Sequence, residues 1–135
     1  MRTRWLLPLL TAACGGPDPV SKSGLDLTTL DGVTDAHIRT MDEMADVVDG
    51  IEDMKTAEAA RPRMEEIGKR FREINAAEES LPPPTPDERR RNDAKLDEAA
   101  KRLEPLFART MDRLDLETRG LVARMMAAAT FGDRR

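Results

Sequence analysis

The sequence predicts an all-α fold, an antiparallel helical hairpin or bundle of three to four helices. The 135 residues include no tyrosine and only 3% aromatic residues, too few for the core of a β-sandwich or barrel. Strong helix formers such as Ala, Leu, Met, Glu and Arg are abundant. Apolar residues also recur at steps of three and four, which is the spacing of one buried helical face. The length fits a single domain.

The first fourteen residues differ from the rest of the chain. Two arginines precede a short apolar run from Trp5 to Leu10, and small residues then lead to the only cysteine, Cys14. This is the layout of a secretory signal peptide. The run is too short to cross a bilayer, which takes about 20 apolar residues. The alternatives are a misassigned start codon, or an N-terminal extension that carries a free or buried thiol.

The residues Leu10-Thr11-Ala12-Ala13-Cys14 resemble the lipobox of bacterial lipoproteins, with Thr11 where leucine is usual. The resemblance implies cleavage between Ala13 and Cys14 and transfer of a diacylglyceryl group to the Cys14 thiol. It also implies a protein of the cell envelope that contacts membrane lipid through this anchor. The covalent lipid on Cys14 is then the only group attached to the chain. In such lipoproteins an aspartate directly after the cysteine is linked to retention in the inner membrane. Here that residue is Gly15, so the resemblance favours the periplasmic face of an outer membrane.

Four segments are expected: a signal peptide over 1–13, the lipidated cysteine and a flexible linker over 14–33, a helical domain over 34–131 and a charged tail over 132–135. The linker is assigned from its Gly, Pro, Ser and Asp content. A flexible chain of that length has an r.m.s. reach of roughly 25 Å. Leu25, Leu27 and Leu30 are expected to dock loosely on the domain.

The first helix is expected to start at Thr34 or Asp35, either of which can cap it, and to run to about Met54. Its apolar face comprises Ile38, Met41, Met44 or Ala45, Val48 and Ile51. Six acidic residues and no basic one lie between Asp42 and Asp53. Like charges four residues apart repel one another, so this helix is expected to lie beside a basic helix. The alternative is a surface for a divalent cation or a basic partner.

The second helix is expected over Thr56 to Leu81, with Met64, Ile67, Phe71, Ile74 and Leu81 on its apolar face. Pro62 removes a backbone hydrogen bond, so it either starts the helix after a short turn or kinks it. The basic residues of this helix suit the acidic first helix as a neighbour; they are Arg61, Arg63, Lys69, Arg70 and Arg72.

Three prolines, residues 82–84, end the second helix, and the third helix starts at Pro86. Thr85 and Glu88 fit a capping box around that start. The short connection predicts that the second and third helices are antiparallel neighbours, although a proline run can also serve as an extended ligand. The first turns, up to Lys95, are polar and are expected to project beyond the core.

Pro105 is expected to kink the third helix, and a shorter fourth helix is expected from about Leu116, with Gly132 as its C-cap. Residues 121–131 are apolar nearly all round. They are therefore expected to be buried or to form an interface, such as one between two copies of the chain.

The sequence shows no catalytic motif. His37 is the only histidine, and neither a phosphate-binding glycine loop nor a paired-cysteine metal site is present. We therefore expect no enzyme and no cofactor. Removal of residues 1–13 would leave 20 basic against 26 acidic side chains, a balance that argues against nucleic acid as a partner. A single cysteine allows no internal disulfide.

The expected function is a structural, scaffolding or partner-binding role for a lipid-anchored protein. The alternative is a periplasmic protein that handles Cu(I), because His37, Met41 and Met44 lie at i, i+4 and i+7 on one helix face, and methionine sulfur suits this soft metal. The same two methionines also fit the apolar face as core residues. In that interpretation His37 lies in an exposed first turn.

Overall fold

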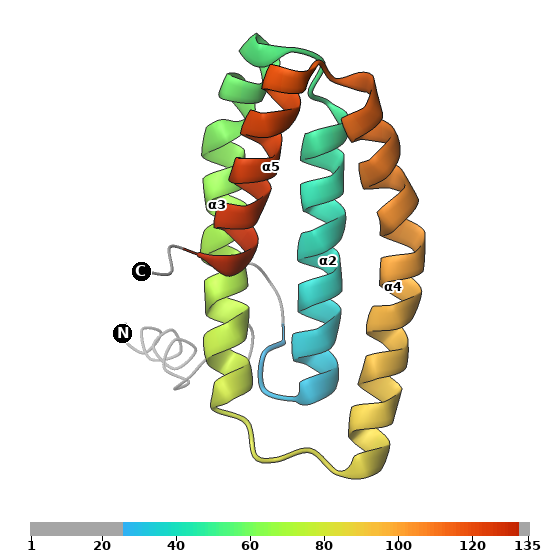
Figure 1. The fold of residues 1–135 in the computed structure, drawn as a ribbon. Helices are drawn as coiled ribbons and strands as arrows, with labels where there is room; N and C mark the ends of the chain where they lie inside the picture. The colour runs from blue at the N-terminus through green and yellow to red at the C-terminus, as the bar shows by residue number, and fades with distance from the viewer. Residues whose placement is uncertain (1–25, 133–135) are drawn as a thin grey trace, which may run out of the picture.

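A computed structural model describes residues 26–132. It contains four helices, which are α2 (Leu30–Asp49), α3 (Met54–Glu79), α4 (Pro86–Arg113) and α5 (Leu116–Phe131). Consecutive helices run antiparallel (Figure 1), so the predicted all-α antiparallel bundle is confirmed with four helices. The predicted signal peptide, Cys14, most of the linker and residues 133–135 lie outside the described residues.

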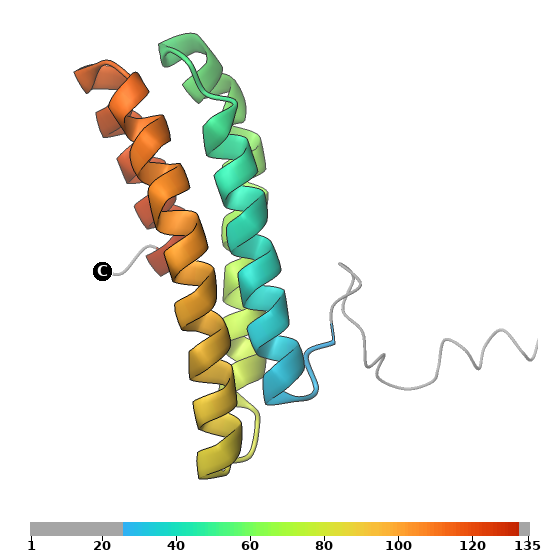
Figure 2. The same ribbon diagram turned by 90° about the vertical axis from the view of Figure 1, so that its right-hand side faces the viewer.

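Helix α2 is the central element, because α3 and α4 both pack along it while α5 packs along α3. Figure 2 shows α2 and α4 side by side and running in the same direction. The prediction that the second and third helices are neighbours is therefore wrong, since α2 lies between α3 and α4. The connection between α3 and α4 must therefore pass two interhelical spacings of about 8–10 Å each. The six residues 80–85 can extend about 19 Å, which is enough.

Helix α2 begins earlier than expected. Its N-cap is Thr29, whose side chain accepts a hydrogen bond from the backbone N–H of Gly32 at 3.0 Å. Thr34 and Asp35, the two predicted caps, lie one turn inside the helix. A Cβ atom at Gly32 would lie 2.1 Å from the carbonyl oxygen of Asp26, so glycine allows the preceding chain to cross the first turn of α2.

The expected docking of the segment before α2 is confirmed for Leu27. Its side chain packs against a small cluster that includes Val33 of α2 and Ile74 of α3. Leu30 belongs to the first turn of α2 rather than to a linker, and Leu25 lies outside the described residues. The chain therefore enters the described body beside the C-terminal half of α3.

The boundary between α2 and α3 also differs from the prediction. Helix α2 ends at Asp49 with Gly50 as its C-cap, whereas an end near Met54 was expected. Asp53 caps α3, because its carboxylate accepts a hydrogen bond from the N–H of Thr56 at 2.9 Å and the Thr56 hydroxyl accepts one from the N–H of Asp53 at 3.0 Å. Asp53 thus completes a capping box and does not extend the acidic face of α2.

The two internal prolines do not end helices. Pro62 lies inside α3 and is exposed, and Pro105 lies inside α4. Of the two alternatives for Pro62, a separate turn before the helix is therefore wrong. Pro62 leaves the carbonyl oxygen of Glu58 without its helical hydrogen bond, and at this exposed position water can supply a replacement.

The predicted caps of α4 and α5 are confirmed. The Thr85 hydroxyl accepts a hydrogen bond from the N–H of Glu88 at 3.1 Å, and the Glu88 carboxylate accepts one from the N–H of Thr85 at 2.9 Å. Pro86 occupies the start of the helix, where its missing N–H costs nothing. Gly132 is the C-cap of α5, with a φ of 72° that favours glycine.

The main core lies between α2, α3 and the whole length of α5. Phe71 of α3 is 1% exposed and is the largest fully buried side chain among residues 26–132. Residues 121–131 contribute four buried side chains, Leu121, Val122, Met125 and Ala129, so burial of this segment is confirmed for one of its faces. The backbones of α3 and α5 come close together, since a Cβ atom at Gly68 would lie 3.2 Å from the Ala129 Cα.

The acidic face of α2 pairs mainly with α4. Four ion pairs join them at 2.6–3.4 Å, namely Asp31–Arg91, Asp35–Lys95, Asp42–Arg102 and Asp49–Arg113. The hydrogen bond from Arg91, with a second from Asn92, holds the pKa of Asp31 below its ordinary value. Exposed pairs contribute at most about 1 kcal/mol each, so they select the parallel register of α2 and α4 more than they stabilise it.

The prediction of a basic neighbour for α2 is confirmed, although α3 contributes less than expected. Its Arg63 and Arg70 both bind Glu43. The prediction that the first turns of α4 project beyond the core is wrong, because Arg91 and Lys95 bind α2 and Asn92 is buried. Of the helices within residues 26–132, none is both long and apolar enough to cross a membrane.

Candidate functional site

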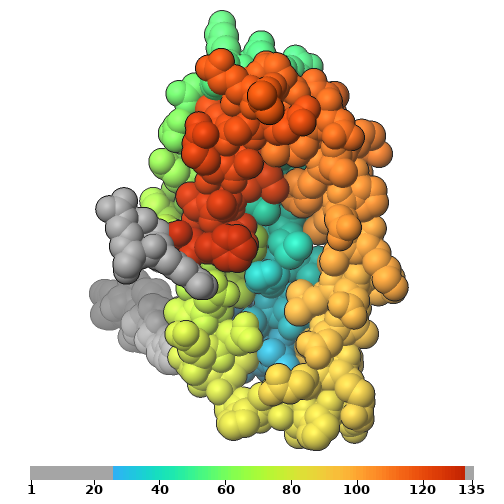
Figure 3. All heavy atoms as spheres, in the orientation of Figure 1, coloured from blue at the N-terminus to red at the C-terminus, as the bar shows by residue number. Residues whose placement is uncertain are grey.

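Helix α5 is shorter than the helices beside it. It has 16 residues, whereas α3 has 26 and α4 has 28. At 1.5 Å per residue it falls about 15 Å short of α3, which is roughly three turns. Figure 3 shows the consequence: below the red atoms of α5 the surface is hollowed, with α2 at the bottom between α3 and α4. We call this hollow the lower groove.

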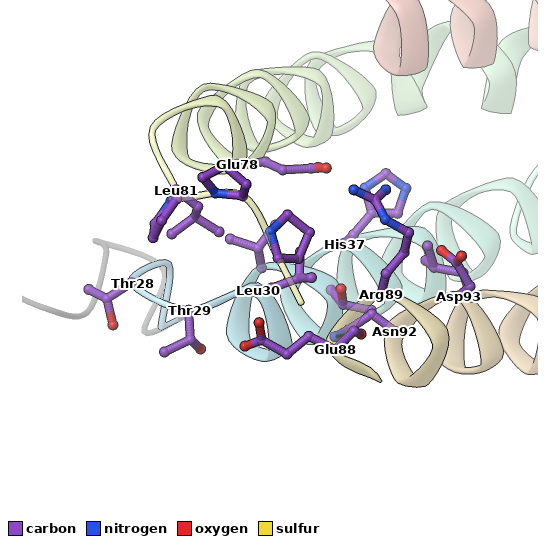
Figure 4. A pocket seen from close by; sticks show the side chains of 16 residues that line it. Thr28, Thr29, Leu30, His37, Glu78, Leu81, Glu88, Arg89, Asn92 and Asp93 are labelled. Carbon is purple, nitrogen blue, oxygen red and sulfur yellow. Dashed lines mark hydrogen bonds between the residues drawn. The ribbon is translucent and has the colours of Figure 1, made fainter. Parts of the chain in front are cut away.

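The lower groove has a volume of about 510 Å³. Helix α2, the end of α3, the prolines at 82–84 and the start of α4 line it. Figure 4 shows side chains from all three helices around the same space. Its polar and charged lining includes Thr34, His37, Glu78, Arg89, Asn92 and Asp93.

One face of α2 forms the floor of the groove. Leu30, Thr34 and His37 lie at i, i+4 and i+7, and the same face continues upward with Met41 and Met44. Met44 is 5% exposed and belongs to the main core, which α5 covers. A single helix face therefore runs from the buried core beneath α5 into the open groove.

His37 is half-buried and not exposed as expected. Its ring lies 5.2 Å from that of Phe71 at a 54° tilt, a common arrangement of packed aromatic rings. Burial lowers the pKa of His37 below its ordinary value of 6.5, and the nearby Glu78 carboxylate acts in the opposite direction. The prediction failed because α2 begins at Leu30, which places His37 in the third turn of the helix.

Asn92 is 3% exposed and holds the start of α4 against α2. Its side-chain nitrogen donates to the Asp31 carboxylate at 2.9 Å and to the Glu88 carbonyl oxygen at 2.8 Å. These two acceptors fix which side-chain atom is the nitrogen. The Asn92 Oδ1 atom is buried and has no hydrogen-bond partner among residues 26–132. An unpaired buried acceptor costs about 1–3 kcal/mol.

The rim of the groove carries more negative than positive charge. Glu78, Asp93 and Arg89 form no ion pair within residues 26–132, and the Glu88 carboxylate is used in the cap of α4. Apolar surface lies between these charges, and it includes Leu96, which is 36% exposed. An apolar groove with an acidic rim suits a ligand that is apolar on one side and basic at its edges.

The residues of the copper hypothesis share one face of α2 but have different surroundings. His37 lines the lower groove, Met44 lies in the core and Met41 is half-buried where the core clusters meet. Within residues 26–132, no three His, Cys, Asp or Glu side chains are grouped as a metal site. Ala13 and Cys14, the predicted cleavage and lipidation residues, lie outside the described range.

Sequence reasoning missed the lower groove and three of its residues, Glu78, Asn92 and Leu96. The available signals were the shortness of the last helix and the polar start of the third, but neither indicates which helices pack together. The packing order decides which segment is left uncovered.

Comparison with known proteins identifies no relative. No protein-family model matches the chain, and no curated protein or solved structure matches it either.

We expect His37 to make the stability of the bundle dependent on pH. Its pKa is lower in the folded protein than the ordinary 6.5, so the unfolded chain takes up the proton first as the pH falls. We expect the melting temperature to fall progressively once the pH drops below about 6.5. In a His37→Gln variant this slope between pH 7 and pH 5 should be flatter. An equal slope in the two proteins would show that another group is responsible.

Proposed function

We propose that this chain is a lipid-anchored cell-envelope protein whose helical body binds a partner protein in the lower groove. The anchor is inferred from residues 10–14, and the periplasmic face of an outer membrane is the proposed location. The observation that carries the binding role is the short α5, which leaves a groove with apolar surface and an acidic rim. The groove lining contains one histidine and no serine or cysteine, which favours binding over catalysis.

The proposed occupant is an amphipathic helical segment of the partner, about three turns long, with Lys or Arg beside its apolar face. The length follows from the shortfall of α5, because a helix of that size would complete the bundle. Its apolar side would cover Leu30, Leu81 and Leu96. Its basic side chains would meet the unpaired carboxylates of Glu78 and Asp93.

Site-specific photo-crosslinking in cells tests this proposal. A photoreactive residue at position 96 lies in the groove, and one at exposed Glu104 on the same helix serves as the control. We expect position 96 to form one dominant adduct whose crosslinked peptide is a basic amphipathic helix. Adducts of equal yield at both positions would contradict the proposal. A crosslink to a second copy of the chain, or to an acidic segment, would do so as well.

A further inference from the structure

A second groove lies between α3 and α5, and it differs from the first in charge. It has a volume of about 650 Å³, and four cationic side chains line it, against one acidic side chain, Glu65. The four cations are Arg61, Lys69, Arg72 and Arg124. We call this the basic groove. The concentration of positive charge contrasts with the whole chain, in which 26 acidic residues outnumber 22 basic ones.

Two of the four cations lack an internal counter-charge. Arg61 and Lys69 each pair with a glutamate one turn earlier in α3. Arg72 and Arg124, in contrast, have no carboxylate within ion-pair distance among residues 26–132, and both are exposed. Arg72 extends from α3 and Arg124 from α5, and both line the groove, so each offers an unpaired cation to an anionic surface.

Exposed apolar surface accompanies these charges. Arg124, Ala128 and Phe131 lie at i, i+4 and i+7 and therefore share one face of α5. Phe131 is 62% exposed, one of the few large apolar side chains of the described region at the surface. At a lipid surface an arginine can meet lipid phosphate and an exposed aromatic ring can enter the headgroup layer, so this face offers both kinds of contact.

The proposed anchor would bring this face close to a membrane. The described body begins at Asp26, twelve residues after Cys14, and a chain of that length reaches about 40 Å at most. Leu27 packs on the cluster of Val33, Ala36 and Ile74, so the chain enters the body where α2 meets α3, the helix that carries three of the four cations. Arg72 lies about 8 Å along α3 from Ala77, well within the reach of the tether.

We propose that the basic groove is a contact surface for an anionic phospholipid bilayer. This inference rests on the proposed anchorage, which would supply the high local concentration that a weak surface contact needs. The contact would orient the body with α3 and α5 toward the lipid and would leave the acidic face of α2 and α4 toward the aqueous phase.

Vesicle sedimentation of unacylated protein tests the surface contact separately from the anchor. The full-length Cys14→Ala protein is mixed with phosphatidylglycerol–phosphatidylcholine vesicles or with phosphatidylcholine vesicles alone. We expect binding to the anionic vesicles to exceed binding to the neutral ones and to weaken with added salt. In the double variant Arg72→Ala/Arg124→Ala, binding should fall about fivefold for each arginine removed.

The matched control is Arg39→Ala/Arg109→Ala, which removes the same charge from exposed positions on α2 and α4. It should retain most of the binding, and circular dichroism should show that both variants melt as the parent does. Residues 1–13 are the same in every variant, so any binding of theirs to the vesicles cancels when the variants are compared. Equal binding by the two double variants would overturn the inference, as would equal binding to the two vesicle types. Acylation of Cys14 in the wild-type protein is measured independently, so either proposal can fail alone.

Discussion

Replacing Phe71 with alanine is expected to lower the free energy of unfolding by about 3–5 kcal/mol. The side chain is 1% exposed, lies in the main core and contacts the ring of His37 at the point where the covered part of α2 meets the lower groove. Its removal leaves a cavity that helices of a small bundle can close only in part. Domains of this kind are stable by about 5–15 kcal/mol in total, so the variant should lose a large part of its stability.

Urea unfolding followed by circular dichroism measures this loss, and Phe131→Ala is the matched control. Phe131 is 62% exposed, so the same substitution there should change stability by less than about 0.5 kcal/mol. If the two variants unfolded at the same urea concentration, the core would not lie where the structure places it.

The second large effect is expected at Cys14. If the thiol carries the lipid, a Cys14→Ala protein should move from the membrane fraction to the soluble fraction of lysed cells. The only apolar run before Cys14, Trp5 to Leu10, is too short to hold the protein in a bilayer. The α-helices of residues 26–132 offer no spanning segment in its place.

A Ser21→Ala protein is the control for the fractionation, because it changes a polar residue of the same region without touching the thiol. It should fractionate with membranes to the same extent as the wild-type protein. Retention of the Cys14→Ala protein in the membrane fraction, at the wild-type level and at high salt, would show that something other than a thioether-linked lipid holds the chain.

The ends of several helices could be predicted from the sequence because a helix cap depends only on residues close to it in the chain. The Thr85–Glu88 capping box and the Gly132 C-cap depend on residues within one or two turns, and the structure reproduces both. The start of α2 was predicted one turn too late because it depends on a tertiary contact. Gly32 indicates a linker by composition, yet its role is to let Asp26 cross the helix, a contact that no local pattern reveals.

The packing order was not predictable from the same patterns. The acidic face of α2 correctly predicted a basic neighbour, but α3 and α4 both carry enough Lys and Arg to serve. Helix α4 supplies the row of ion pairs because its cations match the spacing of the aspartates on α2. Arg91, Lys95 and Arg102 each lie 60 residues after the aspartate that they bind. The lower groove follows from that choice and from the length of α5, so it became visible only in the assembled bundle.

The mass of the N-terminal peptide of the protein purified from its native membranes tests the anchorage most directly. The account predicts a chain that begins at Cys14 and carries the mass of a diacylglyceryl group on its sulfur. A peptide that retains Met1 to Ala13 and carries a free Cys14 thiol would contradict it.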